Sequence, residues 1–384
     1  MYFERCLTPA SVELLGSGGR AAAALSNLTD ITLHTFFPDR YKEDVLSNFN
    51  ALNIETHIHP STDVVEFHYH FPLSSPRFAP SPLPTANAAK VAGENIIRFG
   101  CVEGELIVEG SMAVYDPQSG SAPQPFGQNG SKADRLAMVL NENEIASLSK
   151  GDNLKERVNN LTDRPEVVIV KSGPSGAHVF QSGEYSGHIP IYRSNSVYKI
   201  GSGDIFTAMF AYNWCEKELD ALHSADEASR YVAHYVENRS KQMPEHLPEM
   251  EPIVAGNSPK KVYLAGSFFS TEHIWLIEEA YAALRALHIP IFSPYHDVGL
   301  GTGKEIAEAD LAGLSECSVL FALISDRDPG TMLEIGYALA NGKKVIVFSE
   351  NPGPQDLTMV TGAGCAKFCD LATAIYNVAW EAMT

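Results

Sequence analysis

Several acidic residues lie in segments whose apolar pattern predicts burial, although acidic side chains are usually exposed to solvent. Glu334 lies in DPGTMLEIGYALA, an apolar run that predicts a buried helix followed by the strand KKVIVFS. Asp328 opens that run, and Asp310 lies beside the apolar stripe of a second predicted helix, KEIAEADLAGLSEC. Like charges that converge raise one another's pKa, so such a set is costly unless a ligand uses it.

Three converging carboxylates suit chemistry on a sugar. One can act as nucleophile, one as an acid, and one as an anchor for a hydroxyl group. The alternative for Glu334 is structural, because a glutamate in the first turn of a helix complements the helix dipole by a few tenths of a kcal/mol. The residues alone leave both interpretations open.

A glycine-rich turn marks a second candidate site. YKIGSGDIFTAMFAY places Gly201, Ser202 and Gly203 between a strand and a helix, with Asp204 beside them. N–H groups at a helix N-terminus bind phosphate oxygens, and an adjacent aspartate can take a proton from a hydroxyl nucleophile. The pattern predicts phosphoryl transfer, or else a glycine turn with an aspartate cap. The glycines of GSGGRAAAALSNL, directly before a predicted helix, could also allow a ligand to approach the backbone closely.

The elements that position these residues form two predicted domains. Residues 1–240 and 261–384 both alternate strands and helices, and the proline-rich residues 241–260 between them read as a linker. Alternation with continuous apolar strands predicts parallel sheets covered by helices on both faces, so both halves are α/β. Ligands bind such sheets at the carboxyl ends of the strands, where the polar segments AGSFFS, SPYHDVGLGTG and SDRDPGT follow three predicted strands. The segment LSSPRFAPSPLPTANAA predicts an exposed loop.

Composition excludes several classes of function. The chain has 384 residues, 45% of them hydrophobic and 20% charged, which is typical of a soluble globular protein. Its formal charge of −19 repels phosphate backbones, so nucleic acid is not an expected partner. It has no apolar run of about 20 residues and no signal peptide, so we expect no membrane partner and a cytoplasmic location. The six scattered cysteines form no zinc pattern, and no metal site is predicted on protein ligands alone.

Residues 260–350 resemble the nucleoside 2-deoxyribosyltransferases and their hydrolytic relatives, the nucleotide N-glycosidases. The similarity rests on YLAGSFF, SP, the D-L-x-G-L helix, D-P-G-T-x-x-E-I-G-Y-A and G-K-x-V, in that order. The resemblance implies a Rossmann-like (flavodoxin-like) parallel sheet. It also implies that Glu334 is the nucleophile that attacks C1′ of the sugar, that Asp310 handles the proton on the nucleobase, and that Tyr263 holds Glu334 in place. A second base or a water then resolves the glycosyl intermediate.

The same resemblance implies a set of substrate-binding residues. Asp328 stands six positions before the nucleophile, where transferases acting on free nucleosides have an acidic residue and monophosphate hydrolases tend to have serine. It is therefore expected to bind the sugar 5′-hydroxyl and to repel a 5′-phosphate. In this family a neighbouring subunit usually contributes an asparagine, for which this chain offers Asp356 in QDLTMV, and a homo-oligomer is expected. The remaining expected substrate contacts are Gly266, Ser267, Phe268 and His296, although His296 could equally be a loop histidine without a role.

Residues 10–240 resemble the ribokinase-like (PfkB) sugar kinases, through GGRAAAAL, YDPQSG, LNENEIASL, VVIVKSGPSGAHVF and GSGDIFTA. The resemblance implies a ribokinase-like α/β sandwich that uses ATP and Mg²⁺. Asp204 would be the catalytic base, Gly201, Ser202 and Gly203 would form the anion hole, and Asn141 and Glu144 would organise the magnesium and phosphate region. Family members usually carry about 20 more residues before the GG motif, with the first strand and a sugar-binding aspartate. The domain could therefore be a kinase of changed specificity or a non-catalytic remnant.

Three functions follow from these patterns. The first is a bifunctional enzyme of nucleoside and sugar metabolism, which cleaves or exchanges an N-glycosidic bond and also carries a kinase. The second keeps the glycosidic reaction and treats the first domain as a scaffold. The third makes both halves nucleotide sensors, but the retained Asp204, Asp310 and Glu334 argue against it.

Overall fold

The structure is a computed structural model that describes residues 1–384 except 81–86, 119–121, 257, 302, 325–327 and 354–356. The chain packs as two compact units. The first comprises residues 1–194 and 198–252, and the second comprises residues 195–197 and 253–384. Each unit has its own sheets and its own buried apolar core, so each is described by itself.

The second unit is built on a parallel sheet of five strands. The order across the sheet is β16-β15-β17-β18-β19, and every neighbouring pair is parallel. Numbered along this unit the order is 2-1-3-4-5, the flavodoxin-like order, whose ligand site lies at the carboxyl ends of the first and third strands. The strands are β15 (Val262–Gly266), β16 (Ile291–Phe292), β17 (Val319–Leu323), β18 (Lys344–Phe348) and β19 (Ala366–Phe368).

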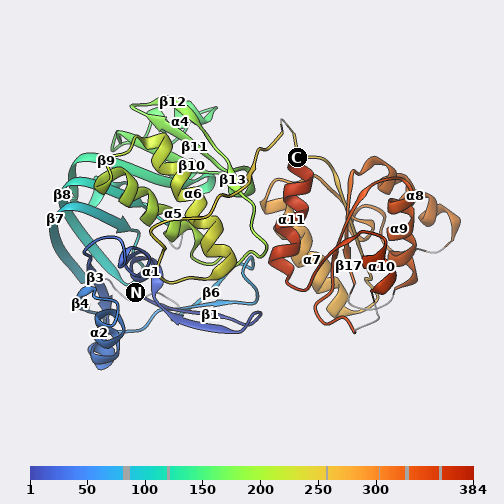
Figure 1. Cartoon of the computed structure of the whole chain (residues 1–384), viewed down its shortest axis with the longest axis horizontal. Coiled ribbons are helices and arrows are strands. Elements are labelled where there is room, and N and C mark those ends of the chain that lie inside the picture. The colour runs from blue at the N-terminus through green and yellow to red at the C-terminus, as the bar shows by residue number, and fades with distance from the viewer. Residues whose placement is uncertain (81–86, 119–121, 257, 302, 325–327, 354–356) are drawn as a thin grey trace. The chain divides into compact units, whose positions relative to one another are not determined.

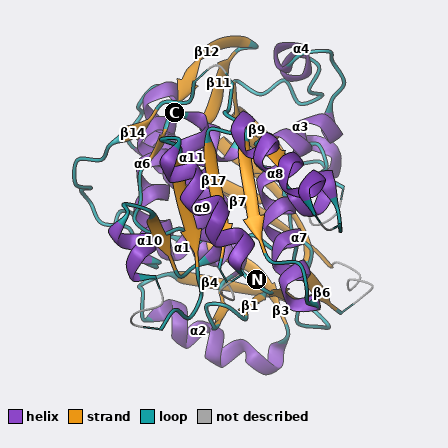
Figure 2. Cartoon of the chain, turned by 90° about the vertical axis from the view of Figure 1, so that its right-hand side faces the viewer, coloured by secondary structure: helices purple, strands orange, loops and turns teal. Residues whose placement is uncertain are grey.

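Helices cover both faces of this sheet because its central strands are apolar on both sides (Figure 1). Helices α7 and α11 pack together on one face, and α8 packs with α9 on the other. Helix α9 lies against β17 and β18 (Figure 2). The helices are α7 (Thr271–Ala286), α8 (Lys304–Glu316), α9 (Pro329–Ala340), α10 (Thr358–Gly362) and α11 (Leu371–Met383), with one π-helical turn at Pro294–Val298.

The first unit is built on a mixed sheet of six strands in the order β12-β11-β10-β9-β8-β7. Strands β7 to β10 are parallel, whereas β11 and β12 run antiparallel to their neighbours. A four-stranded sheet, β2-β1-β5-β6, and a parallel pair, β3-β4, complete the unit. The strands are β1 (Phe3–Cys6), β2 (Ser11–Leu14), β3 (Thr32–Phe37), β4 (Glu55–Pro60), β5 (Glu66–Tyr69), β6 (Arg77–Ala79), β7 (Asn87–Phe99), β8 (Gly104–Asp116), β9 (Lys132–Asn141), β10 (Val167–Lys171), β11 (Ala177–Gln181), β12 (Glu184–Ile189) and β13 (Ile191–Tyr192), and β14 (Pro252–Ile253) stands where this unit ends.

Helices sandwich the six-stranded sheet as well. Helices α1, α5 and α6 pack together beside β7, β8, β11 and β12, while α3 and α4 bury Ile145 and Val158 against the sheet's other apolar side chains. The helices are α1 (Gly16–Leu25), α2 (Lys42–Asn50), α3 (Glu142–Leu148), α4 (Leu154–Asn159), α5 (Ser202–Ala211) and α6 (Ala221–Asn238). Short helical turns span Asp39–Tyr41, Phe126–Asn129, Gly173–Ser175 and Tyr212–Glu216. The predicted fold class is confirmed: a ribokinase-like α/β sandwich and a flavodoxin-like parallel sheet.

Three local expectations were wrong. The glycines of GSGGRAAAAL lie within α1 instead of before it, and a Cβ atom at Gly19 would make a tight contact of 3.0 Å with the Phe49 ring. The first unit's sheet is mixed instead of parallel, because the turn Gly173–Ser175 reverses the chain between β10 and β11, and a second turn at Ser182 and Gly183 reverses it again before β12. The expected loop at LSSPRFAPSPLPTANAA contains β6 and leads into β7. Within the described ranges, no helix has the length and apolarity needed to cross a membrane.

Candidate active sites

The second unit joins Tyr263 on β15 to Glu334 on α9. The Tyr263 hydroxyl donates a 2.6 Å hydrogen bond to Glu334 Oε1. Tyr263 has no exposed surface, and its ring stacks on Phe292 with the ring centres 5.5 Å apart. The phenol is therefore fixed in orientation, and it holds the carboxylate beside the strand pair at which the order of the sheet reverses.

Burial raises the pKa of Glu334 to about 7. The hydrogen bond from Tyr263 acts in the opposite direction, and the charges of Asp310 and Asp328 raise the pKa further. The three predicted carboxylates, from α8, from α9 and from the residue before α9, thus include two whose charges act on the third, Glu334. A carboxyl that is partly ionised at neutral pH can act as a nucleophile once its proton leaves.

Two buried oxygens beside this cluster have no partner. Asp310 Oδ1 and Ser267 Oγ are both shielded from solvent, and neither makes a hydrogen bond within the described part of the chain. Burial also raises the pKa of Asp310, which favours its protonated form. Ser267 is 4% exposed and follows β15, two positions beyond Ala265 on the face that carries Tyr263. Unsatisfied buried polar atoms are uncommon in folded proteins, so both oxygens are available to a ligand.

Asp328 caps α9. Its Oδ2 accepts hydrogen bonds from the Thr331 backbone N–H at 2.7 Å and from the Thr331 hydroxyl at 2.9 Å. Proline follows it at the first helical position, which suits the start of a helix. The cap fixes the carboxyl group directly before α9, close enough to influence Glu334.

The positions of the other predicted substrate contacts do not decide whether they bind substrate. His296 Nδ1 pairs with Ser293 Oγ at 3.0 Å, its Nε2 lies 3.4 Å from Glu278, and its ring stacks on Tyr281. These contacts hold His296 against α7, so its substrate role stays a prediction. Gly266 and Phe268 flank Ser267 at the end of β15, where Phe268 packs on Tyr295. Asp356 lies outside the described residues.

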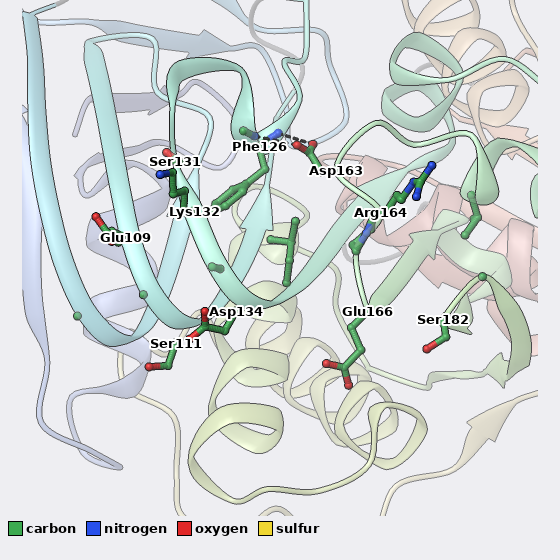
Figure 3. A pocket seen from close by; sticks show the side chains of 18 of the residues that line it. Glu109, Ser111, Phe126, Ser131, Lys132, Asp134, Asp163, Arg164, Glu166 and Ser182 are labelled. Atoms are coloured by element: carbon green, nitrogen blue, oxygen red, sulfur yellow. Dashed lines mark hydrogen bonds between the residues drawn. The ribbon is translucent and has the colours of Figure 1, made fainter.

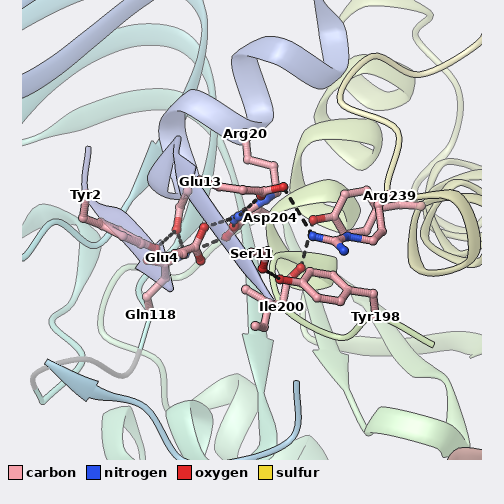
Figure 4. A network of polar contacts seen from close by, with 12 residues as sticks. Tyr2, Glu4, Ser11, Glu13, Arg20, Gln118, Tyr198, Ile200, Asp204 and Arg239 are labelled. Carbon is pink, nitrogen blue, oxygen red and sulfur yellow. Dashed lines mark hydrogen bonds and ion pairs between the residues drawn. The ribbon is translucent and has the colours of Figure 1, made fainter. Parts of the chain in front are cut away.

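In the first unit, Asp204 is a buried member of an ionic network (Figure 4). Arg20 Nη1 donates to Asp204 Oδ2 at 2.6 Å, and Gln118 Nε2 donates to Asp204 Oδ1 at 2.9 Å. Arg20 also bonds Glu4 and lies 3.6 Å from Glu13. Burial raises the pKa of Asp204, and the Arg20 guanidinium opposes this shift. Both oxygens of the predicted catalytic base are therefore already hydrogen-bonded.

The turn before α5 has the features of a phosphate site. Gly201 adopts a left-handed conformation, with φ of 80°, and leads into the first turn at Ser202 and Gly203. Lys199 Nζ donates to Ser202 Oγ at 2.8 Å, and Lys171 Nζ pairs with Asp116 at 3.0 Å. Burial, and then the charge of Lys171, lower the pKa of Lys199 to about 8. Two lysines and a helix N-terminus thus meet at one place.

Asn141 and Glu144 satisfy each other at the start of α3. The Asn141 side chain accepts from the Glu144 N–H at 2.9 Å, and Glu144 Oε2 accepts from the Asn141 N–H at 2.7 Å. This is a capping box, a structural reason for the N-x-x-E pattern. Burial raises the pKa of Glu144, while Lys171 opposes the shift. The charge of Lys171 therefore acts on Glu144, and the role of Asn141 and Glu144 toward magnesium and phosphate stays a prediction.

The described residues of the first unit surround, among others, two cavities. One of about 410 Å³ is lined by residues of α1, including Ser17 and Gly18, by residues of β3 and β7, and by Gln118. The other, of about 1250 Å³, lies at the amino ends of β9 and β10, with Phe126 and Asp163 on its wall (Figure 3). The described lining of this larger cavity contains none of the predicted site residues.

Sequence reasoning missed Arg20, Gln118, Lys171 and Lys199. Arg20 carried a usable signal, because an arginine in the apolar run GGRAAAAL must be paired if the helix is buried. Its partners could not be inferred, since Asp204 is 184 positions away along the chain.

Comparison with known proteins gives two family matches, one in each unit. Residues 262–367 match the family model described as nucleoside 2-deoxyribosyltransferase. A solved 2-deoxyribosyltransferase from Bacillus psychrosaccharolyticus is 31% identical, over 29% of this chain and 87% of that chain, with a TM-score of 0.27. Over its C-terminal unit, the chain belongs to the nucleoside 2-deoxyribosyltransferase family. Glu334, Asp310 and Tyr263 all lie within the part that matches this deoxyribosyltransferase model.

The first unit matches a different family. Residues 114–244 match the model described as pfkB family carbohydrate kinase, as the sequence motifs predicted. A Burkholderia thailandensis nucleoside kinase solved with inosine is 15% identical, over 60% of this chain and 81% of that chain, with a TM-score of 0.44. A Vibrio cholerae fructokinase solved with fructose, ADP and calcium is 14% identical, over 62% and 92%, with a TM-score of 0.44. No curated protein sequence matches the chain significantly.

Proposed function

We propose that the second unit cleaves or exchanges the N-glycosidic bond of a nucleoside or deoxynucleoside through a covalent intermediate on Glu334. The observation that carries the proposal is the hydrogen bond from the buried Tyr263 hydroxyl to Glu334 Oε1. A glutamate that served only to complement the helix dipole would not need a buried phenol from another element. The deoxyribosyltransferase match supports the same conclusion.

The reaction would proceed in two displacements at C1′. Ionised Glu334 attacks C1′, the bond from C1′ to the base nitrogen breaks, and the leaving base takes a proton from protonated Asp310. A second base or a water then attacks C1′, gives its proton to Asp310, and releases Glu334. The raised pKa of Asp310 suits the proton donor, and the hydrogen bond from Tyr263 stabilises the Glu334 carboxylate.

The substrate class follows from the charge around Glu334. The charge of Asp328 already disfavours further negative charge beside Glu334, so a 5′-phosphate with close to two negative charges would be repelled. One Asp328 oxygen is held by Thr331, and the other can accept a hydrogen bond from a 5′-hydroxyl. We therefore favour an unphosphorylated nucleoside.

The test is a product analysis with a panel of nucleosides and their 5′-monophosphates, with and without a free base as acceptor. The expected result is release of base, or exchange of base when an acceptor is present. The covalent step is tested by mass spectrometry of the intact protein, which should gain the mass of one glycosyl group on the peptide that holds Glu334. Base release without any such adduct under rapid quenching would argue for direct displacement by water.

For the first unit, two functions remain from the sequence: an ATP- and Mg²⁺-dependent sugar or nucleoside kinase, or a kinase-like scaffold. The turn before α5 suits the phosphate groups of a nucleotide. Its glycines, Gly201 and Gly203, and the ammonium groups of Lys171 and Lys199 lie together at the start of α5. Ser172 Oγ next to Lys171 is also buried and has no partner among the described residues. Bound ATP would supply the phosphoryl group, and Mg²⁺ would neutralise its charge near Asn141 and Glu144. The fit is poorest at Asp204, which is 6% exposed and is hydrogen-bonded by Arg20 and Gln118 on its two oxygens.

Oligomerisation belongs to the same proposal. A homo-oligomer in which a neighbouring subunit supplies Asp356 to the glycosidic site stays a prediction. Size-exclusion chromatography with light scattering tests the assembly. Asp356→Ala tests the contribution in trans, because mixing it with Glu334→Gln should restore part of the activity if the two residues act from different subunits.

A further inference from the structure

Arg20 occupies the space around the predicted catalytic base of the first unit (Figure 4). It lies on α1 and is 1% exposed, although an arginine is almost never fully buried without partners. Its two terminal nitrogens bond Asp204 and Glu4, and Glu13 lies 3.6 Å away. One guanidinium thus holds together residues from β1, β2 and α5.

The same side chain covers Gly201, the residue that precedes α5. A Cβ atom at Gly201 would lie 2.3 Å from Arg20 Nε, so the guanidinium rests directly on the Gly201 backbone. Arg20 Nε has no hydrogen-bond partner within the described residues, so the hydrogen bonds of the guanidinium are made by its two terminal nitrogens. An acceptor molecule that approached Asp204 from this side would meet Arg20 first.

Arg20 and Gln118 restrict the access of an acceptor hydroxyl to Asp204, which is only 6% exposed. A general base must lie within about 2.6 to 3.2 Å of the hydroxyl that it deprotonates. Arg20 takes Oδ2, and Gln118 takes Oδ1 while also donating to Ser17 at 2.6 Å. Withdrawal of Arg20 would leave Glu4, Glu13 and Asp204 without their shared cation inside the unit, which opposes opening.

We propose that Arg20 is an internal plug of the acceptor position, so that the first unit binds a phosphate-bearing ligand but transfers no phosphoryl group. The plug separates the two ends of the site: the turn with Lys171 and Lys199 stays available, and the place beside Asp204 is filled by the chain itself. This inference rests on the proposed role of Asp204. It is independent of the glycosidic proposal, because Glu334 belongs to the other unit.

The first experiment measures ADP formation from magnesium ATP by the full chain. Wild type and Asp204→Asn are compared with ribose, deoxyribose, fructose, inosine and water as acceptors. We expect equal, background rates for the two proteins with every acceptor. A wild-type rate more than about 10-fold above that of Asp204→Asn with any acceptor would overturn the plug, since acid–base assistance is typically at least 10²-fold.

The second experiment needs no acceptor and tests the plug directly. Arg20→Met alone could fail to fold, because it strands three carboxylates, so the comparison is made in a Glu4→Gln background that removes one of them. The midpoint of thermal unfolding is measured for Glu4→Gln and for its combinations with Arg20→Met, with Asp204→Asn and with both. We expect Arg20→Met to lower the midpoint by roughly 6 °C less when Asp204→Asn is already present. Additive effects would overturn the proposal, whatever the kinase assay gives.

Discussion

The hydroxyl of Tyr263 donates to Oε1 of Glu334 over 2.6 Å, across 71 positions of sequence. The bond links the first strand of the second unit to the helix that follows its third strand. It stabilises the ionised carboxyl, while burial and two neighbouring carboxylates favour the protonated one. The balance sets the pKa of Glu334 at about 7, where small changes in its surroundings alter reactivity at neutral pH.

Glu334→Gln should abolish base release and stabilise the fold above neutral pH. The amide keeps the shape of the side chain but cannot attack C1′. The pKa of Glu334 is higher in the folded state than in the unfolded state, so ionisation destabilises the fold. The penalty is absent below pH about 4.5, grows up to pH about 7, and is full above it, on the order of 3 kcal/mol.

Unfolding midpoints of wild type and Glu334→Gln at pH 5 and pH 8 check the stability part. The gain from the substitution should be larger at pH 8. Glu308→Gln on the exposed face of α8 is the matched control and should change neither property. Retention of a tenth of wild-type turnover by Glu334→Gln would remove the residue from the nucleophile's role.

Tyr263→Phe should move the acidic limb of the rate profile to higher pH. Loss of the hydroxyl removes the interaction that lowers the pKa of Glu334, so a smaller fraction of the carboxyl is ionised at pH 7. A hydrogen bond to a charged group contributes about 1.5 to 3 kcal/mol, so kcat/KM at pH 7 should fall roughly 10- to 100-fold and recover partly at pH 9.

The measurement is kcat/KM from pH 5 to 9 for wild type, Tyr263→Phe and Tyr376→Phe. The last variant removes the hydroxyl of another buried tyrosine, on α11, and should leave the profile unchanged. An equal loss of activity at every pH in Tyr263→Phe would indicate a packing defect instead of a change in the ionisation of Glu334.

The order of elements in the second unit could be read from sequence because each strand is continuously apolar and each helix has one apolar face. Glu334 and Asp310 drew attention for the same reason, since charge interrupts a pattern that predicts burial. The Asp328 cap was not foreseen, although D-P-G-T has the residues of a helix start. Local patterns identify a residue as unusual more readily than they identify its partner.

The first unit was harder to predict because its main features join distant segments. Arg20 meets Asp204 only after α1 and α5 have packed together. Gly18 and Gly19 are typical of a turn before a helix, yet they lie inside α1, where a Cβ atom at Gly19 would come within 3.0 Å of the Phe49 ring. A glycine is consistent with a special backbone angle or with close packing, and sequence alone does not separate these causes.

Lys199 predicts a pH-dependent anion site in the first unit. Its pKa of about 8 means that it is charged at pH 7 and largely neutral at pH 9. Sulfate keeps its charge over this range, so its affinity for the first unit should fall about 3- to 10-fold between pH 7 and pH 9. Calorimetric titration with sulfate checks the change. Lys199→Met should bind weakly at both pH values, and Lys155→Met, at an exposed lysine on α4, should behave as wild type. A wild-type affinity that is independent of pH would exclude Lys199 from the site.

Asp328→Ser should change substrate preference while largely preserving the start of α9. Serine is a good N-cap, so its hydroxyl can replace Asp328 Oδ2 as the acceptor from Thr331. The free energy of unfolding should therefore fall by less than about 1 kcal/mol. The negative charge beside the 5′ position is lost, which lowers the repulsion of a 5′-phosphate.

Asp328→Asn is the matched control, because it keeps the size of the side chain and removes the charge. We expect wild type to prefer a deoxynucleoside over its 5′-monophosphate in kcat/KM, and both variants to narrow or reverse that preference. Equal or better use of the monophosphate by wild type would contradict the role given to Asp328 and would favour nucleotide hydrolysis at Glu334.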